Sequence, residues 1–202
     1  MARYTGPKQR LQRRIGEDLG LKTNALKTAK RINVKPGQHG HKRTRRMSEY
    51  GTQLQAKQRV KYIYGILEKQ LKKLYLLAEK SPLGSGQALL INLERRLDNV
   101  VYRLGWAPTR ALARQLVSHN HVMVNNKKMN IPSYLVERND VINLKKKATN
   151  IPAVSQMMEE DGYDVPDWLE RKHNVGKVLT MPERDQISEK IDEQLIVEYY
   201  SR

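Results

Sequence analysis

Cysteine and phenylalanine are both absent from this chain of 202 residues. Without cysteine the protein can form no disulfide, no thiolate zinc site and no cysteine nucleophile, and a reducing compartment is compatible with the sequence. No apolar run approaches the roughly 20 residues of a membrane-spanning helix, and the charged amino terminus lacks the apolar core of a secretory signal. We therefore expect no membrane partner.

Acidic residues are scarce until late in the chain. There are 38 Lys and Arg against 21 Asp and Glu, which gives a formal net charge of +17. Residues 1–80 carry a net +16, residues 81–150 a net +7 and residues 151–202 a net −6. Such a charge predicts a polyanionic partner, because neutralising phosphates releases condensed counterions. An anionic membrane surface is the electrostatic alternative.

The amino-terminal arm, residues 1–46, has little periodic hydrophobicity and is interrupted repeatedly by glycine and proline. Its apolar surface is too small to offset the conformational entropy lost on ordering. We therefore predict that the arm is largely disordered alone in water and folds against a phosphate-rich partner. Within it, Gly16 to Leu21 is expected to form a turn of helix.

A long helical pattern opens at Ser48. Its apolar stripe recurs at helical spacing from Leu54 to about Lys80, with Gly65 as a candidate break. The glycine- and serine-rich stretch Ser81 to Gly86 then predicts a loop and a domain boundary.

These patterns divide the chain into three predicted parts. They are a basic arm over 1–46, a helical domain over 47–90 and a second domain over 91–182. The apolar tail Leu195 to Tyr200 is expected to be buried against the long helix, so that residues 183–202 complete the helical domain.

Two short amphipathic helices and a hairpin are predicted in the second domain. One helix has its stripe from Leu93 to Leu104, and Thr109 is placed to cap the other. Asn125-Asn126 fits a two-residue hairpin turn, because Asn tolerates positive φ, and Val141 to Leu144 reads as a further strand. The fold class is therefore α+β, a mainly helical first domain with a basic extended arm plus a small helix–helix–β-hairpin module.

The acidic last third is expected to face solvent, another protein or the basic part of its own chain. Pro166 to Leu169 is a candidate anchor, Lys177 to Met181 a candidate strand, and Arg184 to about Glu193 a candidate helix.

The sequence contains no complete motif for an enzyme active site, a metal site or a cofactor site. Gly84-Ser85-Gly86 lacks the third glycine of a dinucleotide site, and there is no Gly-Lys-Ser/Thr phosphate loop. His39 and His41 lack further ligands for a metal ion, and His119 and His121 lack a serine elbow or a carboxylate to orient them. We predict no catalytic residue, no metal and no cofactor.

Arginine-bearing helix faces and a basic arm favour a folded RNA over duplex DNA, since no long recognition helix with dimer symmetry is present. Arginine binds phosphate bidentately and stacks on bases, and exposed tyrosine rings can do the latter. We expect the arginines of the two helices to point outward. The candidate RNA-binding residues are Arg3, Tyr4, Lys8, Arg10, Arg13, Arg14, His39, Lys42, Arg43, Arg45, Arg46, Tyr50, Lys57, Arg59, Lys61, Arg95, Arg96, Asn99, Arg103, Arg110, Arg114, Gln115, Ser118, His119 and Asn120.

Several strings occur in a recognisable order along almost the whole chain, among them Pro36–Gly40, Tyr50–Leu54, Glu94–Gly105, Ala113–His119 and Leu195–Arg202. Through them the sequence resembles bacterial-type protein four of the small ribosomal subunit. Residues 93–155 are similar to the RNA-binding module named after that family. That module also occurs in RNA-modifying enzymes, but residues 156–202 are too short to supply a catalytic domain.

The resemblance implies a structural constituent of the small subunit, present in a single copy, that binds rRNA first and nucleates assembly of the 5′ domain. It implies contact with ribosomal protein five of the same subunit, an interface linked to translational accuracy. It also places Lys42, Arg43, Arg45 and Arg46 near the channel through which mRNA enters.

Two further implications of the resemblance concern regulation and metal. Some members repress translation of their own operon, so an mRNA-binding repressor is the alternative function. Other members hold zinc through amino-terminal cysteines, which this chain lacks, so its arm must be ordered by RNA and packing. The bacterial cytoplasm is the implied compartment, and an organellar ribosome stays open.

Overall fold

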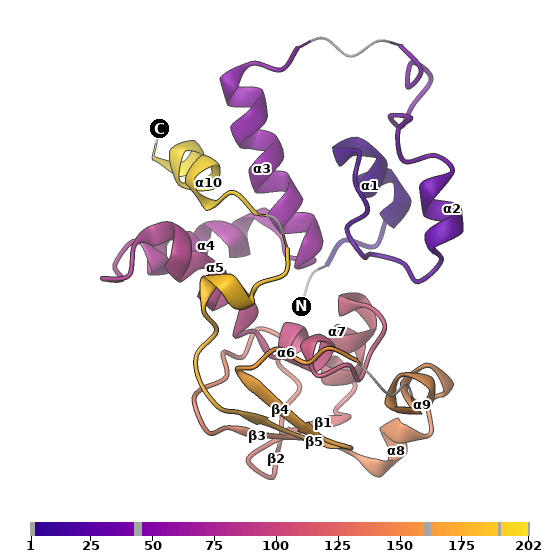
Figure 1. The fold of residues 1–202 in the computed structure, drawn as a ribbon, viewed down its shortest axis with the longest axis vertical. Coiled ribbons are helices and arrows are strands. Elements are labelled where there is room, and N and C mark those ends of the chain that lie inside the picture. The colour runs from indigo at the N-terminus through magenta and orange to yellow at the C-terminus, as the bar shows by residue number, and fades with distance from the viewer. Residues whose placement is uncertain (1–2, 43–45, 160–162, 190, 202) are drawn as a thin grey trace. The chain divides into compact units, whose positions relative to one another are not determined.

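The chain forms two compact units, residues 1–88 with 190–202, and residues 89–189. The computed structural model describes residues 3–42, 46–159, 163–189 and 191–201. Helices make up the amino-terminal part, and the second unit contains a small antiparallel sheet, so the predicted α+β class is confirmed (Figure 1). The sequence prediction placed its boundaries at residues 90 and 183, a few residues from those of the two units.

The first unit is helical where the structure describes it. The long helical pattern after Ser48 forms two helices. Gly65, at φ 61°, lies between them, which confirms the predicted break. Ser48 Oγ accepts a hydrogen bond from the Gly51 amide at 3.2 Å and caps the first of the two. The helices of this unit are α1 (Lys8–Ile15), α2 (Ala25–Ala29), α3 (Glu49–Ile63), α4 (Glu68–Ala78), the start of α5 (Ser85–Glu94) and α10 (Glu193–Tyr200).

The arm contains α1 and α2, and the prediction of a helical turn from Gly16 to Leu21 is wrong. The helix lies earlier, because Pro7 suits the residue before a first turn and Gly16 ends α1 in the left-handed region at φ 89°. Ile15 and Leu19 are buried. The disorder expected of this arm in isolation stays a prediction.

The carboxyl-terminal helix α10 packs against α3, which confirms the prediction for the apolar tail (Figure 1). Ile196 is fully buried there. Gln53 Nε2 donates to Glu198 Oε2 at 3.0 Å, and the rings of Tyr75 and Tyr200 stack with centroids 4.7 Å apart. Two ends of the sequence thus build one unit.

The second unit has a five-stranded sheet in the order β2-β1-β3-β5-β4, with every neighbouring pair antiparallel. Thr109 Oγ1 accepts from the Leu112 amide at 3.3 Å and caps its helix as predicted. Asn125 and Asn126, at φ 49° and 62°, form the predicted hairpin turn. The elements are the end of α5, α6 (Leu97–Arg103), α7 (Arg110–Ser118), β1 (Val122–Val124), β2 (Lys127–Lys128), β3 (Val141–Leu144), α8 (Lys146–Thr149), α9 (Pro152–Glu159), β4 (Leu169–Lys172), β5 (Val175–Val178) and a 3₁₀ turn over Arg184–Gln186.

Three predicted elements of this unit differ in the structure. The helix expected from Leu93 starts only at Leu97, because Arg96 is extended and forms a bridge with Leu135. The strand expected at Lys177 lies two residues earlier in β5, and its partner β4 was not predicted. The helix expected from Arg184 to Glu193 is a single 3₁₀ turn, after which α10 begins separately.

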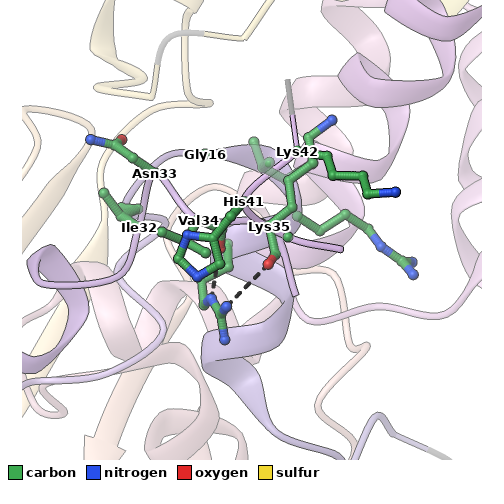
Figure 2. A pocket seen from close by; sticks show the side chains of 11 residues that line it. Gly16, Ile32, Asn33, Val34, Lys35, His41 and Lys42 are labelled. Atoms are coloured by element: carbon green, nitrogen blue, oxygen red, sulfur yellow. Dashed lines mark hydrogen bonds between the residues drawn. The ribbon is translucent and has the colours of Figure 1, made fainter. Parts of the chain in front are cut away.

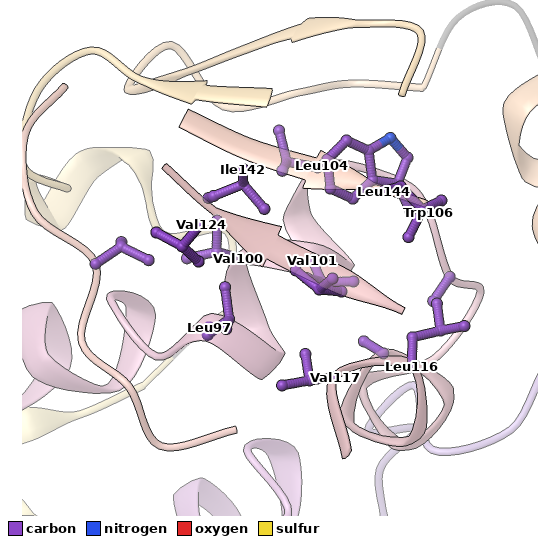
Figure 3. Close-up of a cluster of buried hydrophobic side chains, with 14 of the residues drawn as sticks. Leu97, Val100, Val101, Leu104, Trp106, Leu116, Val117, Val124, Ile142 and Leu144 are labelled. Carbon is purple, nitrogen blue, oxygen red and sulfur yellow. The ribbon is translucent and has the colours of Figure 1, made fainter. Parts of the chain in front are cut away.

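One hydrophobic core joins α6 and α7 to one face of this sheet (Figure 3). Side chains from α6, such as Val101 and Leu104, meet Ile142 and Leu144 of β3. The two tryptophans of the chain, Trp106 and Trp168, are both buried in this core, the latter confirming the candidate anchor. Tryptophan fluorescence therefore reports on the second unit.

Gly105, which follows α6, occupies a position that other residues tolerate poorly. Its φ is 69°, and a Cβ at this residue would lie 2.6 Å from Tyr163 Cδ1. We expect Gly105→Ala to lower the free energy of unfolding of the second unit by about 1–3 kcal/mol, measured by urea denaturation with tryptophan fluorescence. In a Tyr163→Ala background, Gly105→Ala should lower the free energy of unfolding by a smaller amount. Equal costs in both backgrounds would contradict a steric cause.

Candidate nucleic-acid interface

The arginines of the two helices α6 and α7, which were predicted to point outward, are instead largely buried. Arg96, Arg103 and Arg114 are at most 8% exposed, and Asn99 is buried with them. Arg110 is half-buried and its guanidinium lies 4.5 Å from the centre of the Tyr102 ring. The prediction that these side chains lie off the apolar stripe of the helices is correct. Their guanidinium groups, however, contact carboxylates of the chain where contact with solvent was expected. An ionised group that leaves water needs a partner of opposite charge, and here the chain supplies one.

Five side chains form a closed ring of hydrogen bonds, which we call the ion-pair ring: Glu94, Asn99, Arg103, Arg110 and Glu189. Arg103 Nε and Nη2 donate to the two oxygens of Glu94 at 3.0 and 2.8 Å. Asn99 Nδ2 donates to Glu94 Oε2 at 2.7 Å, and Asn99 Oδ1 accepts from Arg110 Nε at 2.8 Å. Glu189 closes the ring by accepting from both Arg103 and Arg110.

A second cluster surrounds Asp98, which is 4% exposed. Arg96 Nε and Nη2 donate to its two oxygens at 3.0 and 2.7 Å, and Arg114 Nη1 donates at 3.2 Å. Arg95, half-buried, donates from Nε to the Val136 carbonyl at 3.0 Å. These contacts tie the guanidinium groups of Arg95, Arg96 and Arg114 to the fold.

Glu189 has a strongly shifted pKa. Burial of this carboxyl raises the pKa, but the charges of Arg110 and Arg103, with the hydrogen bonds they donate, outweigh burial and lower it to about 2. The carboxylate therefore stays ionised in any ordinary buffer, and the ring keeps two carboxylates against two guanidinium groups.

Several predicted residues of the first unit are also occupied by contacts within the chain. Lys57 is 4% exposed and donates to Glu68 Oε1 at 2.8 Å, and Lys61 reaches the other oxygen at 3.1 Å. Arg59 is half-buried and pairs with Glu17 at 2.7 Å. These three residues of α3 make ion pairs within the chain, and Lys57 is buried; their contact with RNA stays a prediction.

Other predicted residues are exposed, in two groups. One group follows the arm and the start of α3, and the other gathers at the last turn of α7 and just after it. Arg43 and Arg45 lie outside the described residues, and Lys8 is half-buried. The exposed residues are Arg3, Tyr4, Arg10, Arg14, His39, Lys42, Arg46, Tyr50, Gln115, Ser118, His119 and Asn120.

Positive charge in the arm is poorly compensated around Lys8. Partial burial lowers the pKa of this amine, and the nearby charges of Arg3 and Lys22 lower it further. The Lys8, Arg3 and Lys22 cations therefore lie close enough to repel one another, and an anion bound beside them would reduce that repulsion.

Exposed lysines that the residue prediction omitted lie on the second unit. Lys127 and Lys128 form β2, at the edge of the sheet, and Lys146 and Lys147 belong to α8. The clustering of lysines in the sequence was the available signal.

No cluster of three or more metal-binding side chains exists among the described residues. Where the structure describes the chain, no helix has both the length and the apolar character needed to cross a bilayer.

Comparison with known proteins gives matches over the whole chain. Residues 3–94 match the model of the ribosomal protein S4/S9 N-terminal domain, and residues 95–142 match that of the S4 domain. The chain is 50% identical over 210 residues to the small ribosomal subunit protein uS4 of Aquifex aeolicus, with 100% of both chains covered. The chain belongs to the uS4 family. Proteins of the same name from Parabacteroides distasonis and Natranaerobius thermophilus are 48% and 47% identical, again over the full length of each chain.

Membership of the uS4 family confirms the resemblance inferred from the sequence strings. The two uS4 family models meet between Glu94 and Arg95, six residues after the second unit begins. The matched S4 domain therefore contains α6, α7 and the hairpin, and with them Asp98 and most of the ion-pair ring.

Proposed function

We propose that the chain is a structural constituent of the small ribosomal subunit and a primary rRNA-binding protein that nucleates assembly of the 5′ domain. The observation that carries this proposal is the excess of exposed cationic side chains on the arm, in a family of small-subunit proteins. Residues 1–80 carry a net charge of +16. Phosphates of a folded RNA supply the missing negative charge.

The mechanism we propose is electrostatic clamping by two surfaces. The arm offers many lysine and arginine contacts to phosphates, and the end of α7 offers Gln115, Ser118 and His119 for hydrogen bonds to sugar and phosphate. Each contact carries little sequence information, so the shape of the RNA is selected. The buried arginines act indirectly, by keeping α6 and α7 in a fixed arrangement.

Charge reversal on α1 tests this mechanism. Arg10 and Arg14 are exposed, one helical turn apart. We expect Arg10→Glu with Arg14→Glu to lower the affinity for 5′-domain rRNA about tenfold or more, because charge-assisted hydrogen bonds contribute about 1.5–3 kcal/mol each. Filter binding at several salt concentrations should also give a shallower salt dependence.

A matched control is Lys172→Glu with Lys177→Glu, which makes the same change in net charge at exposed positions of β4 and β5. This control should bind within a factor of about three of the wild type. If both variants lose the same affinity for rRNA, the effect comes from net charge alone. If the α1 variant binds rRNA as the wild type does, α1 does not belong to the interface.

The finer parts of the proposal rest on membership of the uS4 family. We infer contact with ribosomal protein five of the small subunit and with mRNA near Lys42 and Arg46, a contribution to translational accuracy, and no catalytic activity. The compartment proposed is the bacterial cytoplasm. The alternative, a repressor bound to its own mRNA, uses the same arm, and competition between rRNA and that mRNA for one site would separate primary from secondary roles.

A further inference from the structure

The arm forms a cavity of about 320 Å³, half open to solvent, between the end of α1 and the segments 32–35 and 40–42 (Figure 2). Its residues come from one stretch of the first unit. At the lower end of the roughly 300–1,000 Å³ typical of ligand pockets, it has room for a small group and not for an RNA helix.

Hydrogen bonds inside the arm build the cavity. Arg13 donates from Nε to the Val34 carbonyl at 2.8 Å and from Nη2 to the Lys35 carbonyl at 3.1 Å, as the dashed lines in Figure 2 mark. The Gly40 amide donates to the Gly37 carbonyl at 3.1 Å and so closes a turn over residues 37–40. A Cβ at Gly40 would lie 1.9 Å from the Lys35 oxygen, so the segments are closely packed at this point.

The lining combines two chemistries. Ile15, Ile32 and Val34 provide apolar surface, while Arg14, Lys35 and Lys42 bring positive charge. His41 adds a ring whose nitrogens can donate or accept hydrogen bonds. Among the described residues, none that line the cavity is Asp or Glu.

We propose that this cavity binds one unpaired nucleotide of RNA, with the base inside and its phosphate at the cationic rim. A base has apolar faces and polar edges, which match the apolar wall and His41, and a phosphate matches Lys35 and Lys42. Phosphate alone would gain nothing from the apolar wall. The proposal rests on the proposed rRNA function and names the RNA feature, a splayed-out nucleotide, that the arm would take.

Filling the cavity tests the proposal with the full chain. Ile32→Trp places an indole among the lining residues, and Leu26→Trp places one on the same arm at a side chain that is 80% exposed. We expect Ile32→Trp to lower the affinity for 5′-domain rRNA at least fivefold in filter binding, and Leu26→Trp to leave it within twofold.

A direct probe identifies the ligand. Adenosine 5′-monophosphate added to ¹⁵N-labelled wild type should shift the amide resonances of Gly16 and Gly40 saturably, whereas inorganic phosphate at the same concentration should not. The shifts should vanish in Ile32→Trp. A second pair of variants changes charge without filling space: Lys42→Glu at the rim should weaken nucleotide binding, and Lys30→Glu, exposed and outside the cavity, should not.

The outcomes are distinct. Equal shifts with inorganic phosphate would overturn the nucleotide proposal in favour of an anion site. Normal rRNA affinity of both Ile32→Trp and Lys42→Glu would overturn it as well, while the proposed function stands. Failure of the wild type to bind rRNA would instead remove the proposed function on which it rests.

Discussion

Arg103→Met should lower the free energy of unfolding of the second unit by about 3–5 kcal/mol, the usual cost of removing one partner from a buried ion pair. Arg103 donates to both oxygens of Glu94, which is 1% exposed, and also to Glu189. Methionine preserves part of the volume but leaves the Glu94 carboxylate buried without its principal cation. The remaining Asn99 contact cannot replace a full positive charge.

Urea denaturation followed by tryptophan fluorescence measures this effect, because both tryptophans lie in the core of the second unit. Arg138→Met is the matched control: Arg138 is exposed and donates to the Leu179 carbonyl at 3.1 Å. Arg138→Met should lower the free energy of unfolding by at most about 1 kcal/mol. If the two variants cost the same, the ion-pair ring contributes no more than a surface contact.

Acid should destabilise the second unit through Glu189. Its folded-state pKa is about 2, against an ordinary value of 4.5, so the unfolded chain binds a proton at higher pH than the folded chain does. The stabilisation is fully present above about pH 4.5 and is lost as pH falls toward 2. A shift of this size corresponds to roughly 3 kcal/mol, to be taken as an order of magnitude.

The Glu189→Gln variant isolates this contribution from those of other carboxyl groups. It should be less stable than the wild type at pH 7, and the difference in free energy of unfolding should shrink as the pH is lowered from 5 to 2. A difference that stays constant over this range would show that Glu189 does not ionise differently in the folded and unfolded states.

Local patterns in the sequence were sufficient for many elements of the fold. Apolar spacing predicted α3 and α4, Thr109 as a cap predicted α7, and a side-chain cap marks the starts of α3 and α7. Two adjacent Asn residues were enough for the hairpin, since few residues adopt positive φ readily. Signals of this kind lie within a few residues, which is why they survive without knowledge of the tertiary structure.

Long-range partners were beyond such patterns. Glu189 lies 79 residues after Arg110, and no spacing rule connects them. Glu94 and Asp98, by contrast, were close enough to Arg96 and Arg103 to signal pairing within the chain. The break between α5 and α6 likewise depends on a bridge to Leu135, which only the folded chain provides.

The arm was read correctly in its charge and incorrectly in its local structure. Its few apolar residues, such as Ile15 and Leu19, are buried, and Arg13 is held by two backbone carbonyls. Hydrogen bonds from a side chain to backbone carbonyls cannot be recognised from amino-acid composition. The sequence therefore contained no sign that Arg13 differs from the other basic residues of the arm.

The discontinuous first unit has a consequence for synthesis. α3 precedes residues 89–189 in the chain, but α10, which packs against α3 and supplies the buried Ile196, follows them. Residues 89–189 are complete while α3 still lacks that neighbour. Vectorial folding from the amino terminus, the common order for domains, is therefore reversed in this nascent chain: the inserted unit can finish first, and the outer one must wait until α10 has been made.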